Sequence, residues 1–158
     1  MYLLFRQEVN NGNYKEIEKC KSVATLTSAF KLFLRQLPTP IIERQMVELA
    51  LSSNRASYRE CSAIQLIADL KKSVALLPRV NYKSLHFILL HLKRVADNTE
   101  NRMNSESLAI IFGQNLFPCK RGESLKIDGV LVETEQSNKL AEILITYVHD
   151  MFSDKLVE

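Results

Sequence analysis

Apolar side chains recur at intervals of three and four residues along most of the chain, the spacing that places them on one face of an α-helix. Ser22 can cap the N-terminus of the first strong helix, and Pro38 ends its pattern because proline has no amide hydrogen. The spacing predicts a helix over residues 22–36 with a buried face. That face consists of Val23, Leu26, Phe30, Phe33, Leu34 and Leu37.

Two further amphipathic segments lie between residues 40 and 78. One follows Pro40 and includes Met46. The other begins at a capping box formed by Ser57 and Glu60 and ends before Pro78. Each segment predicts one helix.

The most regular apolar stripe begins after Asn81, which we expect to cap its helix. It contains Leu85, Ile88, Leu89, Leu92 and Val95. A turn-rich loop over residues 97–101 and a short apolar helix from Ser107 to Phe112 should follow, with a break at Gly113.

The last third of the chain combines a loop with a helix. Residues 113–130, with Pro118 and Gly122, predict a long surface loop. The C-terminal helix should bury Leu140, Ile143, Leu144, Val148 and Met151. No segment alternates with period two, so the predicted fold is all-α, a single compact helical bundle over residues 1–158.

Composition narrows the function classes. The 158 residues include 21 Lys and Arg against 18 Asp and Glu, a net charge of +3 that is too small to indicate nucleic-acid binding. Three widely spaced cysteines indicate neither disulfides nor a zinc site, and no signal peptide or membrane span is evident. We expect a cytoplasmic protein that uses no metal, enters no membrane and binds no nucleic acid. Phosphate-binding and hydrolase motifs are also missing from the sequence.

Lys31 and Arg35 form a candidate binding feature. They lie four residues apart on the helix predicted over residues 22–36, on the side away from its apolar stripe. By pattern alone this is either an ordinary solvated helix face or a basic docking site.

Three ordered segments resemble the sequence signatures of Rho-family GTPase-activating domains (RhoGAP, or breakpoint-cluster-region homology, domains). Residues 31–40, Lys-Leu-Phe-Leu-Arg-Gln-Leu-Pro-Thr-Pro, resemble K-x-x-L-R-E-L-P-x-P. Residues 77–95 are similar to the family's L-P-x-x-N-x-x-x-L helix. Residues 101–113 are similar to N-K-M-x-x-x-N-L-A-x-x-F-G-P, which normally continues into proline.

This resemblance implies an all-α bundle that docks on the switch regions of a Rho-family small GTPase, such as Rho or Rac, and stimulates GTP hydrolysis. GTP and Mg²⁺ would belong to the partner, so the chain needs no cofactor and is a regulator rather than an enzyme. The resemblance places Lys31, Arg35, Asn101, Ser107 and Asn138 on the GTPase-binding surface. Family members have asparagine where this chain has Ser107, which shortens the polar reach of that side chain.

An arginine finger normally lies upstream, in a glycine-flanked loop. Arg6 is the candidate in this chain, although it precedes Lys31 by only 25 residues and lacks the expected glycine. The alternative is that residues 1–12 form the helix that follows the finger loop, ending at Asn10-Asn11-Gly12. A finger-less interaction module that binds a GTPase or another protein without activating it therefore stays open.

Overall fold

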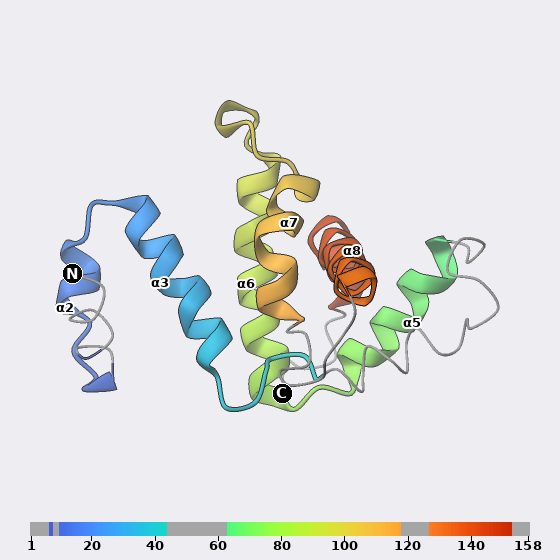
Figure 1. Cartoon of the computed structure of the whole chain (residues 1–158), viewed down its shortest axis with the longest axis horizontal. Coiled ribbons are helices and arrows are strands. Elements are labelled where there is room, and N and C mark those ends of the chain that lie inside the picture. The colour runs from blue at the N-terminus through green and yellow to red at the C-terminus, as the bar shows by residue number, and fades with distance from the viewer. Residues whose placement is uncertain (1–6, 8–9, 44–62, 118–126, 153–158) are drawn as a thin grey trace. The chain divides into compact units, whose positions relative to one another are not determined.

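The computed structural model describes residues 7, 10–43, 63–117 and 127–152 (Figure 1). The secondary structure of these residues is helical, as predicted. The chain divides into two compact units, Met1–Pro38 and Thr39–Glu158. The helices are α2 (Lys15–Lys19), α3 (Val23–Gln36), α5 (Ala63–Ala75), α6 (Arg79–Asp97), the 3₁₀ helix η1 (Thr99–Asn101), α7 (Ser105–Leu116), α8 (Ile127–Thr146) and α9 (Val148–Met151).

Helix α3 confirms the predicted helix over residues 22–36. Ser22 caps it, and its hydroxyl oxygen accepts the Thr25 N–H at 3.3 Å. The predicted burial of the whole apolar stripe is wrong, because Leu34 is buried while Val23 and Phe33 are 75% and 53% exposed. One amphipathic helix cannot cover its own apolar face, and among the described residues of this unit the neighbouring helix α2 has only five residues.

The predicted helix stop near residue 12 is confirmed where the structure describes it. Gln7 and Asn10 are helical, and the Asn11 N–H donates to the Gln7 carbonyl at 3.1 Å. Gly12 has φ +72°, the left-handed conformation that glycine adopts without a steric penalty. Residues 1–6, 8 and 9, which include Arg6, lie outside the described residues.

The core of the second unit forms around α6, α7 and α8, which pack on one another (Figure 1). Most of the predicted α6 stripe is confirmed, since Leu85, Ile88, Leu89 and Leu92 are buried, while Val95 near the end of the helix is half-buried. The predicted capping role of Asn81 is wrong. The helix begins at Arg79, and the Asn81 amide instead donates to the Ile41 carbonyl at 3.0 Å.

Helix α7 differs from its predicted bounds. It begins at Ser105, because Asn104 caps it by accepting the Ser107 N–H at 2.8 Å. It continues through Gly113 to Leu116, so the predicted break at Gly113 is wrong. Glycine is a poor helix former, but packing against a neighbouring helix outweighs a propensity difference of about 1 kcal/mol.

The predicted surface loop over residues 113–130 is also too long. Residues 113–116 belong to α7 and residues 127–130 to α8, while residues 118–126 lie outside the described part. The five apolar residues predicted for the C-terminal helix are buried, with an interruption at Tyr147 between α8 and α9.

The two helices predicted between residues 40 and 78 are only partly described. Met46, Ser57 and Glu60 lie outside the described residues. The second helix is confirmed from residue 63 onward as α5, which ends before Pro78 as expected.

Candidate functional site

Lys31 and Arg35 lie on the C-terminal half of α3. Arg35 is exposed and Lys31 is half-buried. The Arg35 Nε donates to the Lys31 carbonyl at 3.4 Å, one helical turn back. This contact holds the start of the guanidinium group beside the helix backbone, and guanidinium has further N–H donors in a planar fork that suits carboxylates and phosphates.

Asn101 organises the loop between α6 and α7. Its Nδ2 donates to the Val95 carbonyl at 2.9 Å, and its Oδ1 accepts the Met103 N–H at 2.8 Å. Arg102, between Asn101 and Met103, has a left-handed backbone conformation with φ 55°. The Asn101 side chain thus connects the end of α6 to the start of α7, which the sequence pattern did not predict.

Ser107 lies in the first turn of α7. Its backbone N–H is taken by the Asn104 cap, and its side chain is half-buried. Asn101 and Ser107 are therefore both close in sequence to the α7 N-terminus. The sequence signal for this cap is an asparagine, Asn104, directly before the apolar helix, since asparagine is a preferred N-cap residue that accepts an N–H three residues further on.

Asn138 lies on α8 against Gly113 of α7. A Cβ placed on Gly113 would be 2.5 Å from the Asn138 Oδ1 and 3.0 Å from the Asn138 Cα. That oxygen is buried without a hydrogen-bond partner. Beside this contact, the Gln114 Nε2 donates to the Thr134 Oγ1 at 3.2 Å and connects the same two helices. The sequence pattern missed this role of Gly113.

The predicted site residues are divided between the two compact units. Lys31 and Arg35 belong to Met1–Pro38, whereas Asn101, Ser107 and Asn138 belong to Thr39–Glu158. Arg6, the finger candidate, lies outside the described residues.

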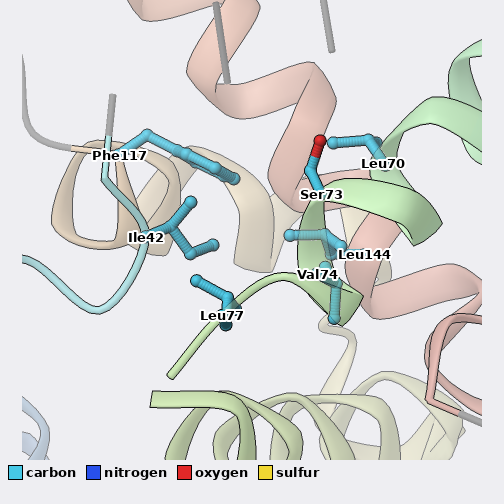
Figure 2. Close-up of a pocket in the computed structure, with 7 residues that line it drawn as sticks. All are labelled: Ile42, Leu70, Ser73, Val74, Leu77, Phe117 and Leu144. Carbon is cyan, nitrogen blue, oxygen red and sulfur yellow. The ribbon is translucent and has the colours of Figure 1, made fainter. Parts of the chain in front are cut away.

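A small apolar cavity lies in the second unit (Figure 2). Its volume is about 10 Å³, which is room for at most one water molecule. This cavity cannot hold a nucleotide or cofactor. It is lined by Ile42, Leu70, Ser73, Val74, Leu77, Phe117 and Leu144.

The described residues contain neither a metal-binding cluster nor a membrane-spanning helix. Within them, no three His, Cys, Asp or Glu side chains are grouped so that they could hold a metal ion. Nor does any helix there have the length and apolar character needed to cross a membrane.

His86 is the described group with a shifted pKa. Its ring stacks on Phe152, with centroids 4.4 Å apart. Burial lowers the pKa of His86 below its ordinary value of 6.5, and the positive charge of His149 lowers it further. This contact links α6 to the residue after α9 and is separate from the predicted site residues.

The second unit thus presents polar side chains near helix ends, and its described cavity is too small for a ligand. The sequence model of the RhoGAP domain matches residues 4–121. The chain therefore belongs to the RhoGAP domain family, as its resemblance to the family signatures predicted.

Named relatives agree with this assignment. Rho GTPase-activating protein 29 of Bos taurus is 32% identical over 152 residues, which cover 83% of this chain and 12% of the relative. Rho GTPase-activating protein 21-A of Xenopus laevis is 29% identical over 154 residues, covering 95% of this chain and 8% of the relative. The chain thus spans only a small part of these relatives.

Solved structures show the same fold. The BH domain of Graf, the GTPase regulator associated with focal adhesion kinase, is 26% identical with a TM-score of 0.69, covering 84% of this chain and 69% of that one. Human Rho GTPase activating protein 15 has a TM-score of 0.71 at 22% identity, covering 84% and 60% respectively.

Proposed function

We propose that this chain is a GTPase-activating domain that docks on the switch regions of a Rho-family small GTPase and stimulates GTP hydrolysis. The observation that carries the proposal is the family match over residues 4–121, which includes Lys31, Arg35, Asn101 and Ser107. The relatives named above are Rho GTPase-activating proteins, which favours activation over binding alone.

Lys31 and Arg35 suit the first part of this function. The switch regions of a GTPase surround a nucleotide with several negative charges. An exposed guanidinium on a regular helix can approach such a surface with its orientation already restricted, because its Nε is bonded to the Lys31 carbonyl.

Asn101, Ser107 and Asn138 would supply polar contacts from the second unit. Asn101 contributes mainly by holding the loop before α7, since both ends of its amide are already bonded. GTP and Mg²⁺ remain with the partner, so the chain acts as a regulator that completes the partner's active site and needs no cofactor of its own. Its place of action is the cytoplasm, where Rho and Rac would be met in their GTP-bound form.

The proposal is tested by single-turnover GTP hydrolysis on Rho and Rac with increasing amounts of the chain, up to saturation. Loss of a charge-assisted hydrogen bond corresponds to about 10- to 100-fold in affinity. Arg35→Ala should therefore raise the concentration of the chain that gives half-maximal stimulation at least tenfold. The melting temperature of this variant should stay within about 2 °C of that of the unmodified chain. Lys71→Ala, which removes an exposed cation from α5, is the matched control and should behave like the unmodified chain.

Arg6→Ala in the same assay addresses the finger. An arginine finger contributes about 10³- to 10⁵-fold in rate. Strong stimulation by the chain and its loss in Arg6→Ala would identify Arg6 as the finger. Tight binding to GTP-loaded Rho or Rac without stimulation would instead favour the finger-less interaction module. Binding to neither GTPase would refute the proposed function and leave only a module that binds another protein.

A further inference from the structure

The contact between Gly113 and Asn138 is closer than any residue with a side chain permits. A Cβ at position 113 would lie 2.5 Å from the Asn138 Oδ1, and 3.0 Å from both the Cα and the N of Asn138. Glycine therefore allows α7 and α8 to approach closely at this point. With any larger residue, either the Asn138 side chain or α8 itself would have to move.

The contact also distinguishes the two ends of the Asn138 amide. Its Oδ1 is buried without a hydrogen-bond donor, an arrangement that is unfavourable by itself. The Gly113 hydrogen that replaces Cβ points toward this oxygen, and a Cα–H group is a weak donor. Rotating the Asn138 amide by 180° would place its NH₂ group against the Gly113 Cα–H and would bury two N–H donors without an acceptor. The oxygen therefore belongs on the inside.

The outer end of the same side chain is the amide nitrogen. Asn138 as a whole is half-buried, so its accessible surface belongs to atoms other than Oδ1. No hydrogen bond to a described residue occupies the Nδ2 in this structure. An amide with its acceptor enclosed can offer a partner only its donor.

We propose that Gly113 is a positioning residue. By admitting Oδ1 between α7 and α8, it turns the Asn138 Nδ2 outward as a hydrogen-bond donor to a carbonyl or carboxylate oxygen of the GTPase. This inference rests on the proposed function, because the acceptor belongs to a Rho-family partner. Gly113 itself touches no partner and acts only through Asn138.

The test is fluorescence titration of the full chain against Rho and Rac, each loaded with GDP and aluminium fluoride. Asn138→Ala and Asn138→Asp both remove the donor and should weaken binding about three- to tenfold, the size of one net hydrogen bond. Gly113→Ala should weaken binding by the same factor. The double variant Gly113→Ala, Asn138→Ala should bind no more weakly than either single variant.

The matched control is Gln114→Ala, which removes the hydrogen bond to Thr134 across the same two helices but leaves the Gly113 contact intact. Its affinity should stay within about twofold of the unmodified chain. Two results would overturn the inference. If Asn138→Asp binds with full affinity, the side-chain oxygen and not the Nδ2 contacts the GTPase. If Gly113→Ala weakens binding as much in the Asn138→Ala background as it does alone, Gly113 acts through helix packing and not through Asn138.

NMR spectroscopy of the unmodified chain tests the outward Asn138 donor even if Gly113→Ala does not fold. The side-chain NH₂ signal of Asn138, assigned by its loss in Asn138→Asp, should shift when the GTPase is added to the ¹⁵N-labelled chain. An unchanged signal in the bound state would overturn the inference. If the unmodified chain binds neither GTPase, the proposed function fails. If it binds and all variants bind equally well, the Asn138 contact and the positioning role of Gly113 both fail, while the proposed function stands.

Discussion

Leu89 allows a quantitative test of the core around α6. Its side chain is 0% exposed. Leu89→Ala removes three buried carbons, which at about 0.8 kcal/mol each amount to about 2.4 kcal/mol. A residual cavity adds to this loss because the surrounding side chains relax only partly, so we expect about 3 to 4 kcal/mol, within the usual range for such changes.

The matched control is Phe87→Ala on the same helix. Phe87 is the larger side chain but is 72% exposed, so its removal should change the free energy of unfolding by no more than about 0.5 kcal/mol. For a chain of this length, the loss at Leu89 corresponds to a fall in melting temperature of about 6 to 16 °C.

Urea unfolding followed by circular dichroism measures both free energies directly, and a thermal melt provides the second readout. The reasoning is refuted if Phe87→Ala costs as much as Leu89→Ala. Burial along α6 would then be distributed differently from the arrangement described above.

Two other changes test local features. Asn101→Ala removes two hydrogen bonds from the loop before α7 and should cost about 1 kcal/mol; the Met103 amide should exchange with solvent faster, and unchanged exchange would contradict the role assigned to Asn101. The lowered pKa of His86 means that the unfolded chain takes up a proton first as the pH falls below 6.5. Stability is therefore full above that pH and decreases below it, toward the lowered pKa. Between pH 7.5 and 5.5 the urea midpoint of the unmodified chain should fall further than that of His86→Phe, which keeps an aromatic ring against Phe152; equal falls would exclude His86 as the cause.

The sequence by itself determined the features that depend on neighbouring residues. The cap of α3 is a contact between Ser22 and Thr25, only three residues apart. The buried stripe of α6 follows from helical periodicity, and the family signatures are local strings of residues. Such features form in the same way wherever the segment lies, so pattern and spacing were sufficient to predict them.

Only the tertiary structure decided the features that join distant segments. Asn81 was expected to cap a helix, but its amide bonds to a carbonyl 40 residues away. Gly113 was expected to break a helix because glycine favours other conformations, yet it lies inside α7 where Asn138 leaves no room for a Cβ. Intrinsic propensity differs by about 1 kcal/mol between glycine and alanine, and the packing of two helices outweighs it. The close approach of α8 cannot be deduced from the residues around Gly113, and for that reason the role of this glycine emerges only from the folded chain.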